Sequence, residues 1–89
     1  MWYHIPMGKS DQTLEAVFAL PMKSNIPFAD LEGLIIALGG EVREGKGSAV
    51  VFELRGRRLF LHRPHPQKEA KRYQVEKIRQ LLQSVGVKP

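Results

Sequence analysis

Two short runs rich in hydrophobic residues lie near the middle of the chain, at residues 48–54, which include Val and Phe, and at residues 57–62. They are separated by Arg55 and Gly56. Because glycine adopts positive φ without steric cost, this pattern predicts an antiparallel hairpin with a two-residue turn. The turn sets the register of the two strands, in which Ala49 lies opposite His62.

Side chains alternate between the two faces of a strand, so this hairpin has a hydrophobic face and a mixed face. The hydrophobic face carries Val50, Phe52, Leu54, Leu59 and Leu61. The mixed face carries Ala49, Val51, Glu53, Arg58, Phe60 and His62. Glu53 lies opposite Arg58 in this register, which predicts a cross-strand ion pair. We expect the first face to form the core and the second, with the HRPHP exit at residues 62–66, to carry the function.

The first half of the chain predicts two helices. A short helix at about residues 11–20 has Ser10 or Asp11 as its N-cap and is stopped by Pro21. A second helix at about residues 28–40 has hydrophobic residues at i, i+3, i+4 and i+7, which is typical of a helix that faces a core. These residues are Leu31, Leu34, Ile35 and Leu38.

Glycines mark the end of this second helix and the turn that follows it. Gly39 is expected to supply a left-handed C-terminal cap. The Gly-Lys-Gly sequence at residues 45–47 joins a short polar strand, at residues 41–44, to the hairpin. Two glycines around a lysine also resemble a phosphate cradle, but no helix follows them, so a plain hairpin turn is favoured.

A final helix is predicted at about residues 71–85, before Gly86, with Lys77 and Arg79 on its exposed side. The element order is therefore α-α-β-β-β-α. This order indicates an α+β fold in which a three-stranded antiparallel sheet packs on two helices, with an extra N-terminal helix. We divide the chain into an N-terminal tail with a short helix, residues 1–24, and a main domain, residues 25–89.

Composition narrows the classes of partner. The chain has 89 residues, about the size at which one domain has one core, and a net charge of +5. The net charge favours an anionic partner such as nucleic acid, an acidic protein or a membrane surface. The alternative interpretation is that the charge only keeps the surface soluble. The absence of cysteine fits a reducing cytosol. Neither a signal peptide nor an apolar run of about 18 residues is present, so we expect a cytoplasmic protein without a membrane span.

Two histidines, His62 and His65, lie three residues apart at the hairpin exit, with Arg63 between them. Cleavage of RNA by its own 2′-hydroxyl needs a base, an acid and cations for the charged phosphorane. Imidazole, with an unperturbed pKa of about 6.5, suits the first two roles. These residues therefore fit a metal-independent ribonuclease, in which Phe60 stacks an unpaired base. Structural histidines that bond turn carbonyls are the alternative.

A metal site is a weaker interpretation of the same residues. His4, His62 and His65 are the three histidines of the chain. Neither a cysteine nor a well-spaced carboxylate completes a ligand set with them. The sequence therefore predicts no metal and no cofactor.

The chain from Asn25 onwards resembles a known family. The segments NIPFADLEGLIIALGGEVREGKGS, LFLHRPHP and QLLQSVGVKP resemble the HicA family of toxins. The TLEAVFA helix at residues 13–19 is similar to one in the longer branch of that family. The resemblance implies a fold like a double-stranded-RNA-binding domain, cleavage of mRNA without the ribosome, and neutralisation by a HicB-type antitoxin.

The residues after Gly47-Ser48 depart from the family pattern. Short HicA-like toxins place a catalytic histidine within one or two residues of this pair, and longer relatives commonly have an arginine directly after the serine. This chain has Ala49-Val50, which can neither move a proton nor pair with a phosphate. Three explanations remain open: the chemistry has moved to the two exit histidines, the toxin is weak or inactive and acts by binding, or Ala49 is a substitution that permitted expression. The pairing of Ala49 with His62 keeps the first explanation geometrically open.

We therefore predict a HicA-type toxin that is an endoribonuclease (an mRNA interferase). His62 is the predicted acid/base residue, and His65 is the second candidate. The predicted RNA-binding residues are Lys46, Ser48, Arg57, Arg58, Phe60, Arg63, Lys68, Lys71 and Arg72. The expected partners are mRNA and a HicB-like antitoxin, and no membrane is expected. A non-catalytic module that binds RNA or protein through the same face is the alternative, and Ala49 favours it.

Overall fold

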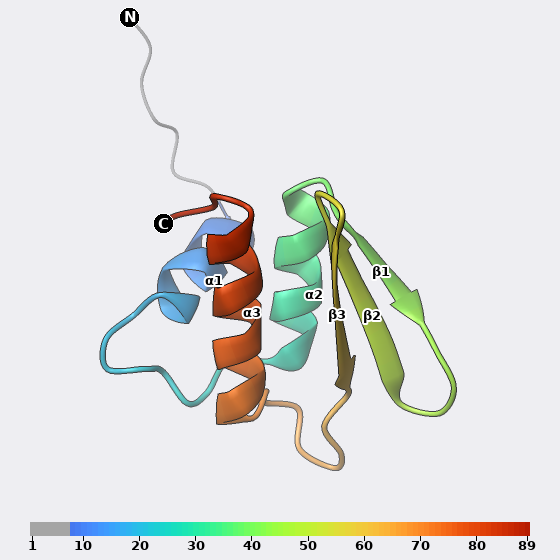
Figure 1. Cartoon of the computed structure of the whole chain (residues 1–89). Helices are drawn as coiled ribbons and strands as arrows, with labels where there is room; N and C mark the ends of the chain where they lie inside the picture. Colours follow the sequence, from blue (N-terminus) through green and yellow to red (C-terminus); the bar gives the residue numbers. More distant parts are fainter. Residues whose placement is uncertain (1–7) are drawn as a thin grey trace, which may run out of the picture.

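A three-stranded sheet has helices on one side and is open on the other in the computed structural model, which describes residues 8–89 (Figure 1). The elements are α1 Lys9–Val17, α2 Phe28–Ala37, β1 Glu41–Glu44, β2 Ala49–Leu54, β3 Arg57–His62 and α3 Arg72–Ser84. Helices α2 and α3 pack on the sheet, and α1 packs on these two helices. The sheet is antiparallel with the order β1-β2-β3. The predicted α+β class and element order are confirmed.

The central hairpin has the predicted register, with Ala49 opposite His62. Its turn consists of Arg55 at φ 49° and Gly56 at φ 83°, and two positive φ angles are what a type I′ hairpin turn requires. The predicted cross-strand pair forms, with Arg58 Nε 3.5 Å from Glu53 Oε2. Residues 45–48 form a plain hairpin turn between β1 and β2 and do not lead into a helix.

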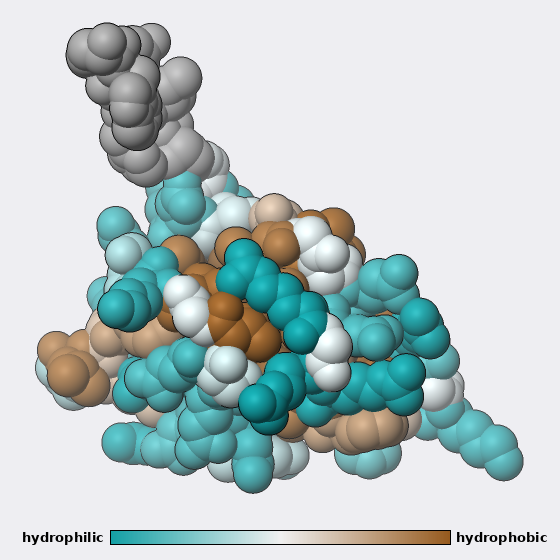
Figure 2. All heavy atoms as spheres, turned by 45° about the horizontal axis from the view of Figure 1, so that its top comes forward, coloured by the Kyte–Doolittle hydropathy of each residue, from teal (hydrophilic) through white to brown (hydrophobic). Residues whose placement is uncertain are grey.

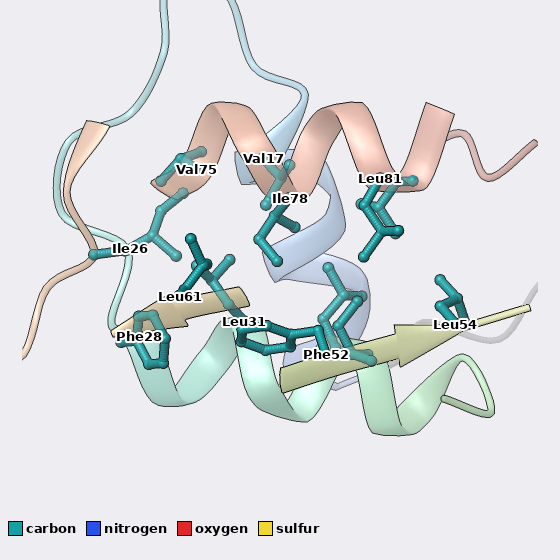
Figure 3. Close-up of a cluster of buried hydrophobic side chains, with 14 of the residues drawn as sticks. Val17, Ile26, Phe28, Leu31, Phe52, Leu54, Leu61, Val75, Ile78 and Leu81 are labelled. Carbon is teal, nitrogen blue, oxygen red and sulfur yellow. The ribbon is translucent and has the colours of Figure 1, made fainter. Parts of the chain in front are cut away.

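The core lies between the sheet and the helices (Figure 3). The sheet contributes Val50, Phe52, Leu54 and Leu61, each of which is buried, and Leu59 is half-buried. The rings of Phe28 and Phe52 join α2 to the sheet, with centroids 5.8 Å apart. The helices contribute Val17, Leu31, Leu34, Ile35, Val75, Ile78, Leu81 and Leu82. The face of the hairpin that was predicted to form the core does so.

Helix α2 ends in a glycine cap, as predicted. Gly39 has φ 91°, its N–H donates to Ile36 O at 2.9 Å, and the N–H of Gly40 donates to Ile35 O at 2.9 Å. These two bonds are those of a Schellman motif, which satisfies the last carbonyls of the helix. Gly40 is also required for packing, because a Cβ there would lie 2.5 Å from the carbonyl oxygen of Glu53.

Helix α1 differs from the prediction at both ends. It begins at Lys9, after Gly8, so Ser10 and Asp11 lie in its first turn and neither is the N-cap. The acidic side chain of Asp11 suits that turn because the N-terminal end of a helix carries partial positive charge. The helix ends at Val17 and does not continue to residue 20.

Arg79 explains the early end of α1. Its Nε donates to Val17 O at 2.9 Å, and its Nη2 donates to Ala19 O at 3.3 Å. The guanidinium thus satisfies carbonyls that have no partner within the helix. The prediction that Arg79 lies on an exposed side of α3 is therefore wrong, because the side chain is part-buried between α3 and α1.

Val17 of α1 is fully buried in the same core as the residues of α2 and α3. The division of the chain between residues 24 and 25 stays a prediction. His4 lies outside the described residues. Within residues 8–89, none of the helices combines the length and the apolar character that a membrane crossing requires.

Candidate functional site

The imidazole of His62 lies beside the hydroxyl of Ser48 at the end of β3. The distance between His62 Nδ1 and Ser48 Oγ is 3.2 Å, and both side chains are exposed. The carbonyl oxygen of Ser48 also accepts a hydrogen bond of 2.9 Å from the N–H of Arg63, which follows His62 in the chain. Because Ser48 engages Nδ1, Nε2 is the ring nitrogen that remains to meet a ligand.

A buried glutamine holds the backbone of His62 from the side of the helices. Gln74 of α3 is 1% exposed, and its Nε2 donates to His62 O at 2.7 Å. Its Oε1 accepts from the N–H of Lys71 at 2.9 Å, so both ends of the buried amide are paired. Sequence analysis missed this residue. The available signal was a glutamine four residues before Ile78, on the apolar side of the helix.

The loop that carries His65, residues 63–71 between β3 and α3 (the exit loop), is anchored at its far end. The N–H of Phe28 donates to Lys68 O at 2.8 Å, and the N–H of Ala70 donates to Ile26 O at 2.7 Å. These bonds form an isolated antiparallel bridge between the start of α2 and the loop. The loop therefore runs past the first turn of α2, and His65 is exposed on it.

Arg63 pairs with two carboxylates from different elements. Its Nη2 lies 2.7 Å from Glu32 Oε2 in α2, and its Nη1 lies 3.2 Å from Glu44 Oε2 at the end of β1. The hydrogen bond to Glu32 raises the pKa of Arg63, although burial acts in the opposite direction. Arg63 as an RNA-binding residue stays a prediction. Its charge is compensated within the protein, and its side chain ties the exit loop to α2 and β1.

The open face of the sheet combines an exposed aromatic ring with paired charges. Phe60 is 69% exposed and lies opposite Val51. Arg43 of β1, which sequence analysis did not consider, lies 2.8 Å from Glu41 and 3.4 Å from Glu53. The hydrogen bond to Glu41 raises the pKa of Arg43. These pairs leave the ring of Phe60 as the large hydrophobic surface of the open face.

Other predicted RNA-binding cations are exposed and unpaired. Within residues 8–89 this group forms no ion pair, and it consists of Lys46, Arg57, Lys68, Lys71 and Arg72. Arg57 and Arg58, together with Lys77, line a hollow of about 240 Å³ between β3 and α3. Positive charge is therefore available at the start of β3, in the turn before β2, and beyond the end of β3.

At the opposite end of the sheet, the contacts stabilise the fold. There Arg55 Nη1 donates to Val85 O at 2.8 Å, which joins the turn between β2 and β3 to the end of α3. Figure 2 brings this end forward and shows hydrophobic side chains gathered at its centre with hydrophilic ones around them. The two histidines of the described chain lie at the other end.

The described residues bring no three His, Asp or Glu side chains together as metal ligands. A metal site that includes His4 involves a residue outside the described part of the chain.

The fold and these side chains define a small basic α+β domain with a histidine held at the end of a strand. A family model described as the HicA toxin of bacterial toxin-antitoxin systems matches residues 28–87. The match covers more than half of the chain, so the chain belongs to the HicA toxin family. It begins at α2, and α1 precedes it. Neither the curated proteins nor the solved structures contained a match.

Proposed function

We propose that this toxin is an endoribonuclease that cleaves mRNA in the cytoplasm without a ribosome or a metal ion. The observation that carries the proposal is the 3.2 Å contact between His62 Nδ1 and Ser48 Oγ. A general base needs a defined orientation, and the hydroxyl partner at Nδ1 together with the Gln74 bond to the backbone supports it. The family membership supports a toxin whose partner is an antitoxin.

In the proposed reaction, His62 Nδ1–H donates to Ser48 Oγ, which leaves the lone pair of Nε2 free to act as a base. Nε2 takes the proton of an RNA 2′-hydroxyl, and the 2′-oxygen forms a bond to the adjacent phosphorus. The bond between phosphorus and the 5′-oxygen breaks as that oxygen takes up a proton, for which His65 is the candidate donor. The products are a 2′,3′-cyclic phosphate and a free 5′-hydroxyl.

The exposed cations and Phe60 would bind the RNA that undergoes this reaction. Lys68, Lys71 and Arg72 lie in the exit loop or directly after it, Lys46 lies in the turn between β1 and β2, and all four are exposed and free to meet phosphates. Phe60 lies two residues before His62 on the same face of β3, so a base stacked on its ring would lie beside the imidazole. Single-stranded RNA is the substrate that such an exposed ring favours.

Ala49 supports a second candidate, a non-catalytic module that binds RNA. Ala49 is the cross-strand partner of His62, and its methyl group offers no second acid, base or cation at this point. The binding residues are the same in both candidates. They differ in whether His62 transfers a proton or only contacts the RNA.

The test is incubation of the purified protein with a long single-stranded RNA in EDTA, beside the variants His62→Ala and His65→Ala. We expect His62→Ala to reduce cleavage on the order of 10²–10⁴-fold, and the products to carry 2′,3′-cyclic phosphate ends. Because both histidines are exposed, circular dichroism should show that the variants are folded. Intact RNA in every sample, with RNA binding retained, would establish the non-catalytic module instead.

We further propose that a HicB-like antitoxin neutralises the toxin by covering the open face and its cations. An acidic partner surface suits the net charge of +5. The charge reversal Arg58→Glu, at a position on the open face, should then weaken the complex and accelerate its dissociation at low salt. An unchanged affinity for the antitoxin would place its binding surface elsewhere.

A further inference from the structure

A pocket of about 360 Å³ lies between the exit loop and the first turn of α2. Its walls include three proline rings, from Pro27, Pro64 and Pro66. Sites for small molecules range over roughly 300–1,000 Å³, so this pocket has the size for one base-sized ligand and not for a longer segment. Flat apolar walls suit the faces of an unpaired nucleobase.

One side chain gives this pocket an unused acceptor. Glu32 lines it, and its side chain is 17% exposed. Arg63 Nε, at 3.0 Å, and Nη2, at 2.7 Å, both donate to the same oxygen, Oε2. The other oxygen, Oε1, accepts no hydrogen bond from residues 8–89 and is not sealed from solvent. An accessible carboxylate oxygen without a protein donor can accept hydrogen bonds from a ligand.

We propose that this pocket binds one guanine base of the RNA and that Glu32 Oε1 accepts hydrogen bonds from its Watson–Crick edge. Guanine presents two adjacent donors, N1–H and the 2-amino group. Adenine and cytosine place an acceptor beside their amino group, and uracil flanks its N–H with two carbonyls. Because an ionised carboxylate only accepts, it suits the guanine edge best. The inference rests on the proposed function for its choice of RNA as the ligand.

The pocket and His62 are both located at the end of β3. Side chains alternate along a strand, so Arg63 points to the side of the helices whereas His62 points to the open face. The pocket and the imidazole therefore lie on two sides of the same strand end. One RNA strand that crosses this end can place a guanine in the pocket and a neighbouring phosphodiester at His62. Lys68, on the lining of the pocket, is an exposed cation for the attached phosphate.

The first experiment titrates ¹⁵N-labelled full-length protein with the 5′-monophosphates of guanosine, inosine, adenosine, cytidine and uridine. Inosine differs from guanosine only by the missing 2-amino group, so it is the matched control. We expect the guanosine nucleotide to shift the signals of Glu32 and of Arg63 Nε–H, and to bind at least about tenfold more tightly than the inosine nucleotide. Equal binding of all five nucleotides, or shifts confined to other residues, would overturn the proposal.

Two variants distinguish the effect of losing the Glu32 carboxylate from the effect of losing an ion pair to Arg63. Glu32→Gln should abolish the preference for guanosine over inosine. Glu44→Gln also removes a carboxylate partner of Arg63, but Glu44 does not line the pocket, so this variant should keep the preference. A third variant, Ala29→Leu, fills the pocket from an exposed helical position that leucine tolerates, and it should abolish nucleotide binding if Glu32→Gln does not fold. Retained preference in a folded Glu32→Gln or Ala29→Leu protein would contradict the proposal.

Failure of this inference and failure of the proposed function give different results. RNA that is cleaved without any preference for guanine beside the cut would refute the guanine pocket and leave the ribonuclease intact. Guanosine nucleotide bound at Glu32 by a protein that cleaves no RNA would support the pocket and refute the ribonuclease.

Discussion

Phe52 and Phe60 are the same residue type in neighbouring strands, yet they lie on opposite faces of the sheet. Phe52 is fully buried against α2, whereas Phe60 is 69% exposed. Both positions follow from the alternation of side chains along a strand and the register of one hairpin. The comparison shows how this small domain separates its tasks, since one face of the sheet stabilises the fold and the other is left for a ligand.

The two faces also differ in how their residues are held. The face toward the helices is held by close packing of apolar side chains, which is non-directional and shared among many neighbours. On the open face, His62 is held by two directional contacts, one from Ser48 and one from Gln74. A single substitution should therefore alter the candidate site without unfolding the protein.

The largest expected effect of a substitution is on the buried ring. Phe52→Ala should lower the free energy of unfolding by about 3–5 kcal/mol, because it removes apolar contacts and leaves a cavity. Phe60→Ala, on the open face, should change it by no more than about 0.5 kcal/mol. Chemical denaturation followed by circular dichroism measures both values. Similar losses in the two variants would contradict the assignment of the two faces.

Gln74→Met should affect both stability and catalysis. The carbonyl of His62 and the N–H of Lys71 lose their partner, which should cost about 1–3 kcal/mol of stability. With the strand end less firmly held, kcat for RNA cleavage should fall while the Kd for RNA changes little, because Gln74 is buried and does not reach the RNA. A fall in stability with unchanged kcat would show that Gln74 does not position His62.

Phe60→Ala should weaken binding of single-stranded RNA by about 1–3 kcal/mol, since one base loses its stacking partner. Phe60→Tyr keeps an aromatic ring at the same position and is the matched control. Fluorescence anisotropy with a labelled oligonucleotide measures the two affinities. If both variants bind as tightly as the starting protein, the open face is not a stacking surface.

The smallest effect is expected for a single exposed cation. Arg57 forms no ion pair within residues 8–89, so Arg57→Ala should weaken RNA binding a few-fold and reduce the slope of log K against log salt by about 0.7. Arg63→Ala should instead destabilise the protein, because Arg63 bridges Glu32 and Glu44. An unchanged salt slope in Arg57→Ala would exclude a phosphate contact at this residue.

Much of the fold could be predicted from the sequence because its signals are local. The turn at Arg55-Gly56 and the alternation beside it determine the hairpin register, and with it the pairing of Ala49 and His62. Helix α2 follows from its hydrophobic spacing and its terminal glycine. The end of α1 was predicted wrongly, because a distant arginine and not only the nearby proline acts on it.

The sequence by itself determined the order of the elements, the two faces of the hairpin and the presence of His62 at a strand end. Only the tertiary structure decided which charges remain free. Arg63 meets Glu32 across 31 positions of the chain, and Arg79 meets Val17 across 62. The burial of Gln74 beneath His62 is likewise decided by the tertiary structure. Such contacts depend on how helices pack on the sheet, and periodicity along a segment carries no information about partners that are distant in the sequence.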